Sequence, residues 1–334
     1  MTTPPSMRDR YVGCLVGAAL GDALGKLTEP MDYDQVEFRY GPQGVLEPPA
    51  KALYTDDTQM AIATARALVD AGGDALPYVM EAVVRHYLRW YDQQNSPVYR
   101  RAPGLAVIDA LARIHRGVPH TAAADGGAND SIVATRSIPV ALRYRGDPQK
   151  IFETASEISR MTHAHPSAVT GGAASALLVD FALGDLPLDD WIAPAVRLIR
   201  RHAAEAPREV VEALHMVEKT KGWAAEDALE RQFRQRPGYG GGWVADEVVG
   251  MGLWCFMAAP SDFVAATRMG ANAPGMSDTD GVAFLAGALA GARNGVGAIP
   301  PDWVARLEDG ELLRELAEDL YRARATELGE VTEA

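Results

Sequence analysis

Helical periodicity runs along almost the whole chain and limits the fold more than any other feature of the sequence. Apolar residues recur at spacings of three and four, with Ala, Leu, Glu and Arg between them. Strand-like alternation is confined to one short run, residues 36–40. The sequence therefore predicts an all-α fold. The expected helices span residues 60–71, 77–90, 105–116, 151–162, 168–183, 191–204, 209–221, 244–257, 261–269, 281–293 and 312–326.

No linker, repeat or low-complexity tract interrupts these helices. Hydrophobic residues make up 48% of the 334 residues and charged residues 23%, which is typical of a globular chain with a sizeable core. We expect residues 1–334 to form a single compact domain of orthogonally packed helices, with an ordered core from about residue 7 to residue 326.

The chain is acidic, with a formal net charge of -13. Its surface field repels phosphate backbones and anionic lipid, which argues against nucleic-acid binding and membrane binding. An anionic nucleotide remains an acceptable substrate where metal ions or backbone amides supply local positive charge.

The two cysteines and the N-terminal segment indicate a cytoplasmic protein. Cys14 and Cys255 lie in apolar runs without metal-binding spacing, so we expect buried, inert thiols in a reducing compartment. The first residues lack a signal-peptide core, and we expect no segment with the ~18 apolar residues that a membrane span needs. The sequence does not decide between a monomer and a homodimer.

Two segments repeat small residues every fourth position: Gly13, Gly17 and Gly21 in one, and Gly287 and Gly291 in the other. Both are too short to span a bilayer and have charged residues close by. We interpret them as closely packed helices near the centre of the molecule.

Acidic residues stand directly before two of the expected helices, in Thr55-Asp56-Asp57-Thr58 and in Ser277-Asp278-Thr279-Asp280. Either motif alone fits ordinary helix capping. Residues two apart on a regular helix point about 200° from each other, so Asp278 and Asp280 converge only where the chain turns into the helix. If both motifs meet, their four carboxylates require cations, and hard oxygen ligands favour Mg²⁺ or Mn²⁺, with Ca²⁺ as a further option.

Two further motifs carry groups suited to chemistry. Glu29 follows an apolar helix on a turn, where a carboxylate beside a metal cluster could orient water or act as acid and base. His163 and His165 precede Pro166 at a helix end, where both could face a cleft and contact a phosphate or ribose.

Taken together, these residues resemble the ADP-ribosylglycohydrolase family, which includes the dinitrogenase reductase-activating glycohydrolases and the ADP-ribosyl-arginine and ADP-ribosyl-serine hydrolases. Five motifs agree in order along nearly the whole chain, and together they are specific. They are GAALGDALGKLTE at 17–29, TDDT at 55–58, THAHP at 162–166, SDTD at 277–280 and AGALAGA at 286–292.

The resemblance implies a central two-metal cleft in which water attacks C1″ of ADP-ribose attached to a protein or small molecule. The implied metal ligands, for two divalent cations with Mg²⁺ first and Mn²⁺ second, are Thr55, Asp56, Asp57, Asp278 and Asp280. The implied catalytic residues are Glu29, Asp56 and Asp57. The residues assigned to the substrate are Asp22, Asn129, Asp130, Ser131, His163 and His165.

Two departures from the family pattern leave alternatives open. Many members have Thr after the final Asp as another metal ligand, whereas this chain has Gly281. The family's G-x-x-M-R-x-x-P substrate loop keeps only its Arg-x-x-Pro end within residues 129–139. A catalytically weak ADP-ribose-binding or crystallin-like protein, and a two-metal nucleotide pyrophosphohydrolase, therefore remain alternative functions.

Overall fold

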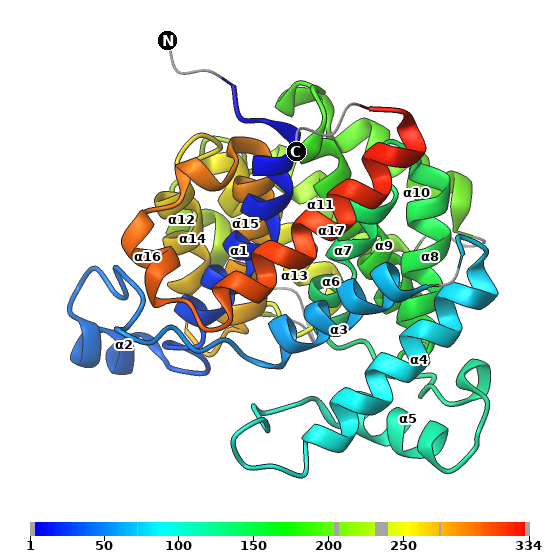
Figure 1. Cartoon of the computed structure of the whole chain (residues 1–334). Coiled ribbons are helices and arrows are strands. Elements are labelled where there is room, and N and C mark those ends of the chain that lie inside the picture. Colours follow the sequence, from blue (N-terminus) through cyan, green and yellow to red (C-terminus); the bar gives the residue numbers. More distant parts are fainter. Residues whose placement is uncertain (1–3, 72, 204–206, 231–239, 274, 331–334) are drawn as a thin grey trace.

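The structure is a computed structural model that describes residues 4–71, 73–203, 207–230, 240–273 and 275–330. Within these ranges the chain is helical and contains no sheet, only isolated bridges such as Ala52 with Leu307 (Figure 1). The predicted all-α fold is confirmed. The helices are α1 (Met7–Gly25), α2 (Tyr33–Tyr40), α3 (Asp56–Asp70), α4 (Leu76–Gln93), α5 (Leu105–His115), α6 (Ile132–Arg136), α7 (Ile138–Arg143), α8 (Pro148–Arg160), α9 (Pro166–Leu183), α10 (Ile192–His202), α11 (Arg208–Lys219), α12 (Ala225–Ala228), α13 (Ala245–Ala258), α14 (Phe263–Ala271), α15 (Thr279–Asn294), α16 (Pro301–Arg306) and α17 (Gly310–Leu328).

Helices α1 and α15 form a close central pair through their small residues. A Cβ atom added at Gly21 would lie 2.0 Å from the carbonyl oxygen of Ala283, and one added at Gly291 would lie 1.9 Å from the carbonyl oxygen of Gly13. Contacts this short leave no room for a side chain, so glycine lets the two backbones touch. The expected close helix packing is confirmed. Because the end of α1 lies against the start of α15, the pair holds the segment that leads to Glu29 beside the second acidic motif.

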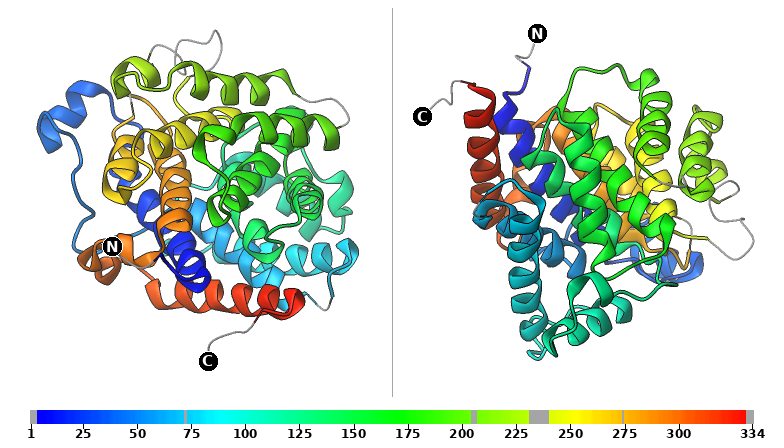
Figure 2. Two further views of the ribbon diagram at one scale, coloured as in Figure 1. Left: turned by 90° about the horizontal axis from the view of Figure 1, so that it is seen from above. Right: turned by 90° about the vertical axis from the view of Figure 1, so that its right-hand side faces the viewer.

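Other helices enclose this pair. Helices α13 and α14 pack against α15, and α9 contacts α15 and α13. Helix α17 crosses the front of the molecule over α1, α3 and α7 (Figure 1), and the turned views place it along the outside of the body (Figure 2). Its last residue, Leu328, lies slightly beyond the end of the core expected from the sequence.

Residues 36–40 were the one strand candidate in the sequence, and they form no strand. They belong to α2, which begins at a capping box in which Asp32 and Gln35 satisfy each other's backbone amides. The helix buries no residue and projects from the body (Figures 1 and 2). The apolar alternation Val36, Phe38, Tyr40 therefore does not mark a half-buried strand, and the cap is the signal that determines the structure.

Helix α9 corrects a second expectation. By length and composition its 18 residues, Pro166–Leu183, could cross a membrane, whereas the sequence had suggested no such segment. In this fold 83% of the helix is buried, as in the core helix of a globular domain.

Cys14 and Cys255 are buried and unpaired, as predicted. The expected helix at 191–204 ends as α10 at His202, and residue 204 lies outside the described residues.

Candidate active site

The first acidic motif forms the start of α3. Thr55 is the N-cap in an extended conformation, and its hydroxyl accepts a hydrogen bond from the backbone N–H of Asp57 at 3.3 Å. Asp56 and Asp57 occupy the first helical turn. The predicted junction between loop and helix is therefore present at this motif.

The second acidic motif forms the start of α15 and converges with Glu29. Asp278 is the N-cap and Asp280 lies in the first turn. One carboxylate oxygen from each of Glu29, Asp278 and Asp280 lies within 4.8 Å of the others. Two oxygen ligands about 2.0–2.6 Å from a common cation lie about 3–5 Å from each other, so this triad has the dimensions of a hard-cation site.

The two motifs meet around Gly281. A Cβ atom at that position would lie 3.3 Å from Asp278 Oδ2 and 3.4 Å from Asp57 Oδ2. The other oxygen of Asp57 accepts a hydrogen bond from the Thr135 hydroxyl at 2.7 Å. Buried Asp278 Oδ2 has no hydrogen-bond partner in the described part of the chain. A buried acceptor without a donor fits a position that a cation would satisfy.

These groups line one small cavity of about 160 Å³ at the ends of α1, α3 and α15. The lining residues are Glu29, Thr55, Asp56, Asp57, Arg101, Ala102, Gly104, Asp130, Ser131, Ile132, Trp243, Asp278 and Asp280. Every residue predicted as a metal ligand or catalytic group therefore borders the same space.

The carboxylates resist simultaneous ionisation without compensating charge. Burial and, second, the Asp280 carboxylate raise the pKa of Glu29 to about 9. The same two causes hold the pKa values of Asp56, Asp57 and Asp278 well above the usual range of a carboxyl. Divalent cations would reverse this effect by stabilising the ionised forms. The donor set therefore fits hard divalent cations.

Asp22 lies behind the cavity. It is fully buried and accepts hydrogen bonds from the backbone N–H of Thr55 at 2.8 Å and from the backbone N–H and hydroxyl of Thr58 at 3.1 and 2.5 Å. Its position is that of a carboxylate that fixes the start of α3, and it does not line the space assigned to substrate. Burial raises the pKa of Asp22 to about 7, with Asp280 as the second cause.

His163 supports the cavity from behind through Asp130. The His163 side chain is fully buried, and its Nε2 lies 2.9 Å from Asp130 Oδ2. Nδ1 of His163 lies 2.7 Å from the Thr162 hydroxyl, which accepts a hydrogen bond from Arg136 Nη2 at 2.6 Å. The Thr162 hydroxyl therefore donates its hydrogen bond to Nδ1 of His163. The ring proton of the neutral imidazole is then on Nε2, which donates to Asp130. Burial lowers the pKa of His163, and this hydrogen bond lowers the pKa of Asp130, so a neutral imidazole holds an ionised carboxylate at the cavity.

Of the three other residues predicted to bind substrate, Ser131 borders the cavity, whereas Asn129 and His165 do not. Ser131 borders the cavity, and its backbone N–H donates to the carbonyl of Trp243 at 3.2 Å. Asn129 does not border it, but its carbonyl accepts a hydrogen bond from Ala245 N–H at 3.2 Å and so pins the same loop. His165 caps α9 through Nδ1, which accepts the Ser167 N–H at 3.2 Å, and it does not line the cavity.

Five cavity residues were not predicted: Arg101, Ala102, Gly104, Ile132 and Trp243. Ala102 has a positive φ of 56°, a conformation rare for a residue with a side chain. Arg101 donates to the carbonyl of Tyr54 at 2.8 Å and pairs with Glu308. The Ala-Pro-Gly turn at 102–104 was the only sequence signal for this wall.

A model of the ADP-ribosylglycohydrolase family matches residues 3–329. The chain belongs to the ADP-ribosylglycohydrolase family. The prediction of an enzyme of this type is thereby confirmed at the level of the family.

Individual relatives extend the comparison. The chain is 30% identical over 332 residues to the ADP-ribosylarginine hydrolase Tri1 of Pseudomonas putida strain GB-1, covering 96% of this chain and 80% of that protein. It is 25% identical to the ADP-ribosyl-[dinitrogen reductase] glycohydrolase of Rhodospirillum rubrum, covering 92% of each chain. A solved structure described as an ADP-ribosylglycohydrolase-related protein complex superposes with a TM-score of 0.69 at 29% identity, covering 95% of this chain and 99% of that one.

Proposed function

We propose that this protein hydrolyses the glycosidic bond between ADP-ribose and its acceptor in the cavity where α3 and α15 begin. The observation that carries the proposal is the convergence of Glu29, Asp278 and Asp280, whose carboxylate oxygens lie within 4.8 Å of one another. In a chain of this family, such a cluster beside Asp56 and Asp57 is a candidate reaction centre.

Two divalent cations are part of the proposal, with Mg²⁺ as the first choice and Mn²⁺ as the second. Thr55, Asp56, Asp57, Asp278 and Asp280 would hold them, and Glu29 lies close enough to share one. When bound, the cations supply positive charge that orients the ribose hydroxyls and offsets the negative charge of the cavity.

Glu29 is the proposed acid and base of the reaction. It lies at the edge of the carboxylate cluster, where it can accept a proton from the water whose oxygen bonds to C1″. The bond between C1″ and the acceptor breaks with its electron pair going to the acceptor, and that proton neutralises the leaving group. The products are free ADP-ribose and the unmodified acceptor.

Asp130 and Ser131 are proposed to position the substrate. Both border the cavity, and the hydrogen bond from His163 fixes the direction of the Asp130 carboxylate. The Ser131 hydroxyl can donate to a phosphate oxygen or a ribose hydroxyl. His163 therefore acts through Asp130 as a positioning residue.

Arginine is the acceptor that we propose. The relative with 30% identity is named an ADP-ribosylarginine hydrolase, and the net charge of -13 favours approach of a cationic acceptor. Serine-linked ADP-ribose is the main competitor.

Product analysis tests the reaction. Arginine-linked and serine-linked ADP-ribosyl peptides would be incubated with the protein and Mg²⁺ or Mn²⁺, and the products identified by mass spectrometry. We expect free ADP-ribose and unmodified arginine peptide. Release of ADP-ribose from the serine peptide alone would show that serine, and not arginine, is the acceptor. AMP with a ribose-phosphate peptide would show pyrophosphate cleavage, and binding of ADP-ribose without any product would show a binding protein.

A further inference from the structure

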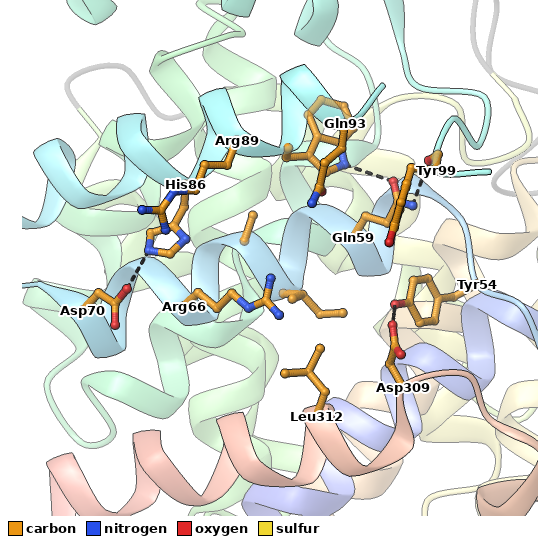
Figure 3. Close-up of a pocket in the computed structure, with 13 residues that line it drawn as sticks. Tyr54, Gln59, Arg66, Asp70, His86, Arg89, Gln93, Tyr99, Asp309 and Leu312 are labelled. Carbon is orange, nitrogen blue, oxygen red and sulfur yellow. Dashed lines mark hydrogen bonds and ion pairs between the residues drawn. The ribbon is translucent and has the colours of Figure 1, made fainter. Parts of the chain in front are cut away.

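A second pocket of about 550 Å³ lies between α3, α4 and α17, and it shares no lining residue with the catalytic cavity. Figure 3 shows its side chains converging from the three helices and from the segment at Tyr99. Its size lies within the range of small-molecule sites, about 300–1,000 Å³. The lining residues are Tyr54, Gln59, Ile62, Ala63, Arg66, Asp70, His86, Arg89, Trp90, Gln93, Tyr99, Asp309 and Leu312.

The two facing helices carry unusual residues for a helix interface. On α3 the lining positions 59, 62, 63, 66 and 70 follow helical spacing, and on α4 the positions 86, 89, 90 and 93 do the same. Such a stripe is normally apolar when two helices pack. Here each stripe contains an arginine, and the helices separate enough at that point to leave a pocket.

The two arginines of the pocket have no acidic partner. Within the described ranges, Arg66 and Arg89 make no hydrogen bond or ion pair, whereas Arg101 and Arg143 are held by carboxylates. Both side chains are exposed to solvent. Two guanidinium groups that lie in one concavity without an ion-pair partner can both donate hydrogen bonds to an anion.

The two carboxylates of the pocket already have donors. Asp70 Oδ2 lies 2.8 Å from His86 Nε2, and Asp309 Oδ2 accepts the Tyr54 hydroxyl at 2.6 Å. Burial lowers the pKa of His86, so at neutral pH its ring is neutral and donates to Asp70. In the described part of the chain, no ion pair joins either acid to Arg66 or Arg89.

The polar groups divide the pocket into two ends. Figure 3 places Arg89 and His86 at one end, with Arg66 reaching across the middle. Gln59, Gln93 and Tyr99 lie toward the other end. Guanidinium groups bind phosphate through paired hydrogen bonds, and aromatic and amide side chains suit a planar ring with polar edges.

We propose that this pocket binds a phosphorylated small molecule of nucleotide size, with its phosphate at Arg66 and Arg89 and its ring at the Gln93 and Tyr99 end. A nucleoside monophosphate has this two-ended chemistry. The site is separate from the catalytic cavity, and its occupancy does not depend on the proposed hydrolase activity.

The pocket also adjoins elements that shape the catalytic cavity. Gln59 accepts the Trp90 indole N–H at 3.0 Å and donates to the carbonyl of Tyr99 at 2.9 Å. Two residues later, Arg101 borders the catalytic cavity and bonds to the carbonyl of Tyr54, the residue before Thr55. A ligand in the pocket therefore contacts residues adjacent to one wall of the reaction centre.

Titration calorimetry tests the proposal with two probes, inorganic phosphate and AMP. The variants are Arg66→Gln, Arg89→Gln and the double substitution, with Arg85→Gln as the matched control. Arg85 is exposed on the same helix one turn before Arg89, and it does not line the pocket. A further variant, Asp56→Asn, reports binding at the catalytic cavity.

We expect saturable AMP binding that weakens at least about tenfold in each arginine variant and is unchanged in Arg85→Gln and Asp56→Asn. Phosphate that binds as tightly as AMP would show a site for the anion alone and would overturn the nucleotide-sized ligand. Absence of saturable AMP binding, or AMP binding that survives the double substitution, would overturn the site. Thermal unfolding of each variant establishes that it is folded.

Discussion

Replacing Gly21 by alanine tests how the central helix pair holds the acidic motifs together. The added Cβ would lie 2.0 Å from the carbonyl oxygen of Ala283 and 2.5 Å from its carbonyl carbon. Both atoms belong to the backbone of α15, so no side-chain rotation relieves the contact. The two helices would have to separate by about 1.5 Å to restore an ordinary van der Waals contact.

The expected cost follows from two opposing effects. Overpacking of a rigid interface costs about 1–3 kcal/mol, with the upper end expected where only backbone can yield. The alanine regains up to about 1 kcal/mol of helix propensity. We expect a net loss of about 2 kcal/mol, which lowers Tm by about 3 °C in a chain of this size.

Activity should fall further than stability suggests. Ala283 lies one turn after Asp280, so a helix shift displaces the second acidic motif relative to Glu29. A misplacement of about 1 Å at a reaction centre can cost about 100-fold in rate. The assays are thermal unfolding and the rate of ADP-ribose release.

The matched control is Gly297→Ala, because no heavy atom lies within 4 Å of the Cβ it would add. Its unfolding free energy should change by no more than about 0.5 kcal/mol. Wild-type stability and activity in Gly21→Ala would refute the inference that the close α1–α15 contact positions the site.

Three further predictions concern the site itself. Gly281→Thr places a hydroxyl beside Asp57 and Asp278 and should raise Mn²⁺ affinity about tenfold in titration calorimetry; unchanged or weaker affinity would contradict this. His163→Ala removes the hydrogen bond to Asp130 and should raise KM about tenfold while Mn²⁺ affinity stays constant, and a loss of metal binding instead would contradict the positioning role. The pKa of Glu29 is raised to about 9 in the folded state, against about 4.3 in the unfolded chain. Between these values the metal-free folded state binds more protons than the unfolded state, so the free energy of unfolding should fall as pH rises from about 4 to 9. Thermal scans in chelator should show this fall and scans in Mg²⁺ a smaller one, whereas a flat or rising Tm in chelator would contradict the buried-carboxylate account.

Much of the helical fold could be predicted because core-facing residues recur with helical spacing. The packing of α1 on α15 was also predictable, since glycine at every fourth position suits a close backbone contact. Short helices were harder to predict from the sequence. The sequence predicted a substrate loop at residues 129–139, but from Ile132 onward the chain forms α6 and α7. These two helices are too short to show helical periodicity in the sequence.

The candidate site was predictable where a motif dictates its own geometry. Thr55, Asp57 and Asp278 mark helix starts in the sequence and do so in the structure. The roles of Asp22 and His163 required coordinates, because burial decides whether a polar side chain faces a ligand or the protein, and burial depends on elements far apart in sequence. Arg101 and Trp243 border the cavity for the same tertiary reason.

The measurement that most directly tests the central claim is metal-dependent release of ADP-ribose from an arginine-linked peptide by wild type, Asp57→Asn, Asp278→Asn and Asp34→Asn. Asp34 is an exposed first-turn residue of α2 and serves as the matched control. The account predicts release that chelator abolishes, that each site substitution lowers at least about 100-fold, and that Asp34→Asn leaves unchanged. Release that persists in chelator, or that survives loss of either Asp57 or Asp278, would contradict a reaction centre formed by the two acidic helix starts.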